Sequence, residues 1–438
     1  MTTWSLVTAL MLSVSTQALD GREAVAIPKA VMSYANRPVL ATDATATTNP
    51  NPVAKQAIAD MLAELNQAGI TNPNQGVWIQ SYDGEIAAGR LSSTPLPSAS
   101  LTKSATTLAA LQTWGSNHRF TTNVSITGKI SGDVLKGDLI IEGGGDPLFV
   151  WEEAIAIGNK INQLGIKRIQ GNLIVAGKFS MNFEPDLVKS AEYLRLALDS
   201  SQWEGEVVAQ YAAMPNGTPK PRLSILGNVR AMPNLAVGNV SSSNLLIRHY
   251  SLPLWQILKQ MNTFSNNEMA EDLAILLGGG KQVAAIAAST SEIPISEIQL
   301  INGSGLGQAN QISPRAIVAI MMAIHNRAQL EGLTIADLFP ISNCNCGTIE
   351  GRKMPKGAIV KTGTLSDVSA LAGIFQTKEH GAIWFAIVNR GDADIDIFHR
   401  SQDRVLQSIV NKWGLPKSQN VLFTETPWKD RDRTEIVK

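Results

Sequence analysis

Two hydrophobic periods alternate along the chain. Where apolar residues recur every three or four positions, the pattern is that of an amphipathic helix with one buried face. This spacing predicts helices at about 53–68, from Ser100 to near Trp114, at 151–164, at 254–261, from Ser265 to Gly278, at 313–324 and at 398–413. Three of these helices begin with a serine, which is a good N-cap residue.

Other apolar runs are short, rich in β-branched residues and bounded by turn residues, which predicts strands. One hairpin is predicted around Asp83-Gly84, with strands at 77–80 and 86–88. Three successive runs late in the chain predict an antiparallel meander: 358–361, 368–375 and 382–388. Four further strands are predicted between His118 and Ser243: 121–126, 139–142, 168–175 and 222–226.

The length of 438 residues is large for one domain, so two structural units are expected. We predict an α/β (α+β) fold in which helices flank an antiparallel sheet. Residues 53–117 and 245–438 would form this domain, and a strand-rich module at 118–244 would be inserted into it. Residues 19–52, which end in a stretch rich in Ala, Thr, Asn and Pro, are predicted to be a flexible segment.

The N-terminus carries a short apolar run, Leu6 to Val14, followed by small residues up to Ala18. This is typical of a secretory signal peptide, here residues 1–18, although no Lys or Arg precedes the run. The alternative is a short N-terminal helix of a cytosolic chain. No stretch reaches the roughly 20 apolar residues that span a membrane. We therefore expect an exported protein of the periplasm or cell envelope.

Composition argues against several functions. Charged residues make up 17% of the chain and the net charge is zero, which gives nucleic-acid binding no electrostatic support. The five His and two Cys lack the spacing of metal ligands, and no phosphate-binding loop is present, so no metal or cofactor is expected. Cys344 and Cys346 fit either two loop thiols or an unusual local disulfide.

Three short motifs follow one another in a meaningful order: Ser-x-x-Lys at 100–103, Ser-x-Asn at 265–267 and Lys-Thr-Gly at 361–363. Each has an ordinary explanation by itself, because serines cap helices and a strand lysine can be solvated. Ser265 with Glu268 also fits a capping box. All three in order, two at helix starts and one on a strand, are typical of active-site serine enzymes of the penicillin-binding class.

The chain from about Val53 to Trp413 resembles the class C low-molecular-mass penicillin-binding proteins, the D-alanyl-D-alanine carboxypeptidase/endopeptidase family. The resemblance extends beyond the three motifs to the segments 97–103, 118–148, 251–254, 302–306 and 347–349. The middle motif is Ser-Asn-Asn, where the family usually has Ser-Asp-Asn, and Asn302 stands where Asp is more common. The short distance from Lys103 to Ser265 implies that a subdomain of larger members is missing.

The resemblance implies a mechanism of acyl transfer without a cofactor. Ser100 would be the nucleophile and Lys103 its base, with a pKa lowered by burial and by the nearby cation Lys361. Ser265 would relay the proton to the leaving amine, and Asn267 would hold the substrate amide. No His lies in the motifs, which argues against a Ser-His-Asp triad.

The same resemblance implies how the substrate binds. The backbone N–H groups of Ser100 and Thr364 would form the oxyanion hole. Thr362 and Thr364 with Lys361 would bind the terminal carboxylate, and Gly363 would complete this strand. The substrates would be peptidoglycan peptides, and β-lactam antibiotics would acylate the enzyme.

Two other functions remain open from the sequence. A serine β-lactamase shares the three motifs, but no Glu-x-x-x-Asn motif occurs between Ser265 and Lys361. A non-catalytic cell-wall-binding protein is the second alternative. The fate of a labelled penicillin separates the three, because a stable adduct, rapid turnover and no adduct are their respective results.

Overall fold

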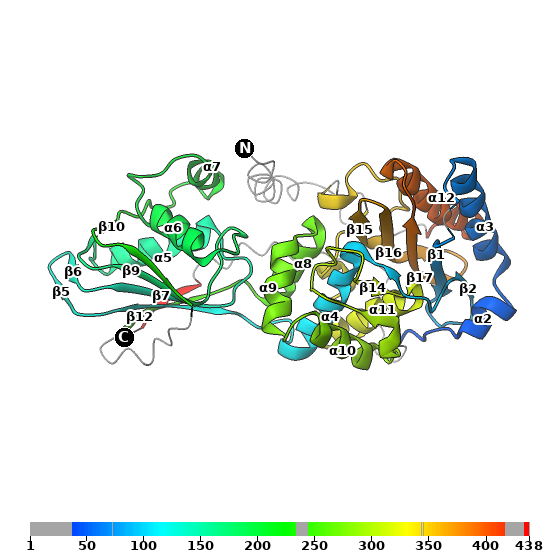
Figure 1. The fold of residues 1–438 in the computed structure, drawn as a ribbon, viewed down its shortest axis with the longest axis horizontal. Coiled ribbons are helices and arrows are strands. Elements are labelled where there is room, and N and C mark those ends of the chain that lie inside the picture. Colours follow the sequence, from blue (N-terminus) through cyan, green and yellow to red (C-terminus); the bar gives the residue numbers. More distant parts are fainter. Residues whose placement is uncertain are drawn as a thin grey trace. The chain divides into compact units, whose positions relative to one another are not determined.

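The computed structural model describes residues 37–71, 73–233, 244–342, 344, 346–416 and 433–437, which form two compact units (Figure 1). The inserted unit contains residues 118–253 and the C-terminal residues 433–437. The split unit contains the described residues before 118 and after 253, up to residue 416. The predicted signal peptide, 1–18, lies outside the described residues.

The split unit is built on a five-stranded antiparallel sheet, as the hairpin and meander predicted. The strand order is β15 (Ile359–Leu365), β16 (Val368–Thr377), β17 (Gly381–Arg390), β1 (Gly76–Ser81) and β2 (Ala87–Arg90). All ten residues of β16 are buried, which requires helices on both faces of the sheet. The α/β fold class is thereby confirmed.

Two helices, α3 (Pro52–Gln67) and α12 (Ile395–Trp413), pack together and bury apolar side chains against the sheet. Four further helices, α8 (Leu254–Phe264), α9 (Asn267–Leu276), α10 (Gly280–Ser291) and α11 (Pro314–Leu330), surround α4 (Thr102–Trp114). Every residue of α4 from Thr102 to Leu111 is buried, so this helix is a rigid base for the residues before it.

The described residues before α3, 37–51, form defined structure where the sequence predicted a flexible stretch. A short helix, α2 (Asp43–Thr48), buries Ala46. The Gln80 side chain donates to Val39 O at 2.8 Å and accepts from Ala41 N at 3.2 Å. These long-range contacts order a stretch whose local composition favours disorder.

The inserted unit has a six-stranded sheet in the order β11, β9, β7, β4, β12, β18 and a smaller one in the order β10, β8, β6, β5. The first contains Val229–Met232, Leu173–Lys178, Leu139–Gly144, Thr121–Ile126, Asn244–Tyr250 and Thr434–Ile436; the second contains Ser224–Ile225, Arg168–Ile169, Val134–Lys136 and Lys129–Ser131. The helices are α5 (Trp151–Gln163), α6 (Leu187–Leu198) and α7 (Glu206–Ala213). Sequence reasoning assigned no helix to the last two, although Ala191, Leu194 and Leu198 form a buried helical face.

The inserted unit extends beyond the predicted boundary at residue 244. Strand β12 pairs with β4 from Asn244 to Tyr250, and the C-terminal strand β18 pairs with β12. Arg433 anchors this last strand, because it donates at 2.5 Å to the buried carboxylate of Glu153. The chain therefore returns to the inserted sheet at its end, a long-range pairing that has no local signal.

Among the described helices, no single one has the length and apolar content to cross a membrane. The bent pair α9 and α10 reaches that length and composition only when the two helices are taken together.

Candidate active site

Ser100 lies in a tight turn at the start of α4. The prediction that it opens the helix was close, but Ala99–Leu101 forms a 3-10 turn and α4 begins at Thr102. The turn is held closely from outside, since a Cβ on Gly305 would lie 1.8 Å from the carbonyl oxygen of Ala99. Ala99 itself has a positive φ of 46°. This packing fixes the half-buried Ser100 just before the N-terminus of a buried helix.

Lys103 is fully buried and binds three oxygens. Its Nζ donates to Ser100 Oγ at 2.9 Å, to Asn267 Oδ1 at 2.8 Å and to Ser304 O at 2.8 Å. The two carbonyl oxygens can only accept hydrogen bonds, whereas the serine hydroxyl can also donate. A neutral amine has two N–H groups and one lone pair. With both N–H groups directed at the carbonyls, the lone pair points at the hydroxyl of Ser100.

Burial lowers the pKa of Lys103 to about 7, while the nearby carboxylates of Glu271 and Glu268 act in the opposite direction. The sequence argument expected Lys361 to depress this pKa as well. Instead, the repulsion between the two lysines falls on Lys361, whose pKa is lowered well below its usual range by burial first and by Lys103 second. Near neutral pH, Lys103 can thus lose its proton, and the charged form of Lys361 is disfavoured.

Ser265 lies between α8 and α9, and Asn267 is the first residue of α9. Ser265 has a positive φ of 54°, and the side chain of Asn266 caps α9 by accepting from Met269 N at 2.9 Å. The predicted capping box of Ser265 with Glu268 was therefore wrong. Since Asp caps a helix as well as Asn, either residue at position 266 leaves the serine hydroxyl available.

The Lys-Thr-Gly motif lies on β15, at the edge of the sheet. Lys361 is fully buried, and its Nζ donates to Ser265 Oγ at 2.9 Å and to Thr362 O at 2.7 Å. A Cβ on Gly363 would lie 3.0 Å from the backbone nitrogen of Ser100. Glycine at this position therefore lets the strand approach the serine turn. Thr364 lies on the same strand face as Thr362 and is exposed.

The predicted residues thus form two hydrogen-bonded groups within the split unit, each centred on one lysine. Lys103 joins Ser100 to Asn267, and Lys361 joins β15 to Ser265.

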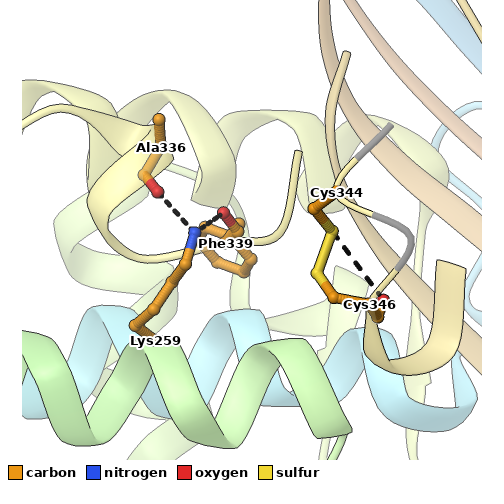
Figure 2. The surroundings of a disulfide bond; sticks show 5 residues. All are labelled: Lys259, Ala336, Phe339, Cys344 and Cys346. Carbon is orange, nitrogen blue, oxygen red and sulfur yellow. Dashed lines mark hydrogen bonds between the residues drawn. A yellow bond between two sulfur atoms is a disulfide. The ribbon is translucent and has the colours of Figure 1, made fainter. Parts of the chain in front are cut away.

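A disulfide precedes the turn that contacts β15. Cys344 and Cys346, which the sequence allowed as thiols or as a bridge, are bonded to each other (Figure 2). The next residues, Gly347–Ile349, form a 3-10 turn in which Thr348 Oγ1 lies 2.6 Å from Thr362 Oγ1. Sequence reasoning did not assign Thr348 to the site.

The segment before this disulfide is held by a half-buried lysine. Figure 2 shows Lys259 donating to the carbonyl oxygens of Ala336 and Phe339, at 2.7 and 2.5 Å. Burial lowers the pKa of Lys259 to about 8. The lysine satisfies two carbonyl groups in and just after the short 3-10 turn Ile335–Asp337, so we assign it a structural role.

Sequence reasoning also missed Glu271, on α9. Its carboxylate oxygens accept from Gly303 N and Ser304 N, both at 3.1 Å. The only available signal was an acidic residue one helical turn after Asn267, which by itself indicates an exposed helix face.

A turn that presents a serine, a buried lysine beside it and an edge strand with a second lysine are the arrangement of an active-site serine peptidase of the penicillin-binding type. The chain belongs to the D-Ala-D-Ala carboxypeptidase 3 (S13) family, whose profile matches residues 54–187 and 233–407. It is therefore a serine-type D-Ala-D-Ala carboxypeptidase, a hydrolase of the bacterial cell-wall class.

Individual relatives agree with this assignment. The chain is 26% identical to the D-alanyl-D-alanine carboxypeptidase DacB of Haemophilus influenzae, over 71% of this chain and 82% of that protein. It is 24% identical to carboxypeptidase DacB of Mycolicibacterium smegmatis, over 84% and 86%. Its fold is similar to that of the penicillin G-acylated predatory endopeptidase Bd3459 of Bdellovibrio bacteriovorus, with a TM-score of 0.68, 22% identity and coverage of 83% and 99%.

Proposed function

We propose that Ser100 and Lys103 carry out acyl transfer on peptidoglycan stem peptides that end in D-Ala-D-Ala. The observation that carries this proposal is the geometry of Lys103, whose lone pair in the neutral state is aimed at the Ser100 hydroxyl. Lys103 takes the hydroxyl proton as the Ser100 oxygen forms a bond to the substrate carbonyl carbon. A pKa near 7 suits a base that works at neutral pH.

Ser265 and Lys361 are proposed to act on the leaving group. The peptide C–N bond breaks, and Ser265 delivers a proton to the nitrogen of the departing D-alanine. Lys361, which donates to Ser265 Oγ at 2.9 Å, lies in position to replace that proton. Water then attacks the ester on Ser100 and the ester C–O bond breaks. Lys103 returns its proton to the Ser100 oxygen as the acid leaves, and the proton lost by the water restores Lys361.

Backbone and amide groups around Ser100 stabilise the substrate. Asn267 uses its oxygen on Lys103, which leaves its NH₂ group to donate to the substrate amide. The N–H groups of Ser100 and Thr364 are proposed to bind the developing oxyanion. The 3.0 Å separation between a Gly363 Cβ and Ser100 N supports this arrangement, because it brings the strand and the turn together.

Lys361 is proposed to recognise the terminal carboxylate, together with Thr362 and Thr364. Among the described residues, no acidic side chain pairs with Lys361, although it is fully buried. Burial and Lys103 both disfavour the ammonium form of Lys361 in the free enzyme, and an incoming carboxylate would favour that form by supplying the opposite charge. This favours substrates with a free C-terminus, the definition of a carboxypeptidase. Endopeptidase action would need a different partner for Lys361.

The wild-type enzyme separates the three candidate functions. We expect it to release free D-alanine from a peptide ending in D-Ala-D-Ala and to form a stable adduct with a labelled penicillin. Penicillin turnover without an adduct would favour a β-lactamase. Absence of both D-alanine release and adduct would favour a non-catalytic cell-wall-binding protein.

We further propose that the enzyme is exported to the periplasm or cell envelope, where its substrate lies. The apolar run from Leu6 to Val14 and the small residues up to Ala18 support this. N-terminal sequencing of the protein from its native host should give a mature chain that begins after Ala18. A cytosolic protein that retains Met1 would contradict the proposal.

A further inference from the structure

We propose that Glu271 is a positioning residue, which aligns Lys103 with Ser100 through the loop at 302–305 and provides negative charge beside the lysine. This inference rests on the proposed role of Lys103 as the base. It concerns a residue that touches neither the nucleophile nor the base by a hydrogen bond in the described structure.

The loop that carries the Ser304 carbonyl is attached to α9 by both oxygens of one carboxylate. Glu271 Oε2 accepts from Gly303 N and Oε1 accepts from Ser304 N, each at 3.1 Å. The attachment is close, because a Cβ on Gly303 would lie 2.4 Å from the carbonyl oxygen of Ala270. Two N–H donors on one carboxylate fix the peptide plane between them.

The loop is also held from the side of α4 and within itself. Thr106 Oγ1 donates to Gly303 O at 2.7 Å. The side chain of Asn302 accepts from Gly305 N at 3.0 Å and donates to Leu306 O at 2.8 Å. An aspartate at position 302 could only accept. The Ser304 carbonyl is therefore presented from a fixed loop.

This carbonyl decides which way the lone pair of Lys103 points. Nζ reaches Ser304 O at 2.8 Å and Asn267 Oδ1 at 2.8 Å, and these two acceptors occupy both N–H groups of the neutral amine. If the loop moves, one N–H loses its acceptor and can turn towards Ser100. The lone pair then no longer faces the hydroxyl proton. Glu271 thus acts on the orientation of the base.

The negative charge of Glu271 also affects the protonation of Lys103. The charged side chains coupled to Lys103 in the described structure are Glu268 and Glu271 on α9 and Lys361 on β15. The two carboxylates favour the ammonium and oppose the effect of burial. Removing one of them should lower the pKa of Lys103 and increase the neutral fraction at acidic pH. Below neutral pH, loss of the positioning contact should lower the acylation rate, whereas loss of the charge should raise the fraction of neutral Lys103 and so the rate.

The test is the pH profile of acylation by a chromogenic cephalosporin, measured from pH 5 to 9 on the full chain. In the wild type, the rate should fall as pH drops through about 7, since a protonated Lys103 cannot act as base. For Glu271→Gln, we expect the maximal rate to fall about 10- to 100-fold, because the amide offers an N–H group to a backbone N–H. The acidic limb of the profile should also move to lower pH.

Two matched variants separate the effects. Glu268→Gln removes a charge on the same helix, and no hydrogen bond joins Glu268 to the loop in the described residues, so the limb should move with a smaller loss of maximal rate. Glu271→Asp keeps the charge and should leave the limb near its wild-type position while lowering the maximal rate. Thermal unfolding of each variant monitors the fold.

The outcomes distinguish failure of the inference from failure of the proposed function. A wild type that is never acylated contradicts the function itself. An acylated wild type whose acidic limb is unchanged in Glu271→Gln contradicts the inference, because a merely structural residue would lower the rate without moving the limb. If Glu271→Gln does not fold, a shifted limb in Glu271→Asp or an unshifted limb in Glu268→Gln would overturn it.

Discussion

Replacing Ser100 by alanine is expected to abolish acylation by penicillin while the chain still folds. The substitution removes the oxygen that forms the acyl bond, so we expect a loss of at least about 10³-fold in peptidase rate. The half-buried side chain accepts one hydrogen bond, from Lys103, whose other two acceptors remain. The change in stability should therefore be about 1 kcal/mol or less. Labelling with a fluorescent penicillin and thermal unfolding measure the two quantities.

The matched control is Ser104→Ala, one helical turn after the nucleophile on α4. Ser104 is buried, and its Oγ has no hydrogen-bond partner in the described structure. We expect this variant to be acylated at the wild-type rate. Equal loss of labelling in both variants would indicate a general defect of α4 and would remove the support for Ser100 as nucleophile.

The second large effect concerns the division of labour between the two lysines. Lys103→Ala removes the proposed base and should lower the acylation rate about 10²- to 10⁴-fold for every substrate. Lys361→Ala removes the proposed carboxylate partner and should act selectively. We expect it to lose a preference of roughly 10- to 100-fold for a D-Ala-D-Ala peptide over its C-terminal amide, the value of a charge-assisted hydrogen bond.

The measurement is the acylation rate of each variant on the free acid and on the amide. The two variants are controls for each other, because both remove a fully buried lysine from the same site. Lys103→Ala should slow both peptides alike, whereas Lys361→Ala should bring their rates together. If Lys361→Ala keeps the wild-type preference for the free acid, the carboxylate role of Lys361 is wrong.

The sequence predicted the elements whose signals are local. The period of α3 and α11, the Asp83-Gly84 hairpin and the three strands of the meander all result from patterns within about 20 residues. The three motifs have fixed spacings, so they could also be found. The structure adds that their side chains meet through the two lysines.

The features that the sequence did not predict depend on partners far along the chain. Order at 37–52 comes from Gln80, and the last strand is fixed by pairing with β12 across about 185 residues. Glu271 resembles an ordinary helix-surface residue until its loop partners, some 30 positions later, are placed. Tertiary contacts decided these three cases. The capping role of Asn266 is local, because its side chain accepts from Met269 N, and it became clear only from the positive φ of Ser265.

Identification of the acylated residue in the wild-type enzyme tests the central claim most directly. After incubation with penicillin, trypsin should release the peptide 91–103, which contains Ser100 and three other serines. We predict that mass spectrometry finds the penicilloyl group on this peptide and that fragmentation places it on Ser100. A penicilloyl group on any other serine would contradict the assignment of the nucleophile and the mechanism built on it.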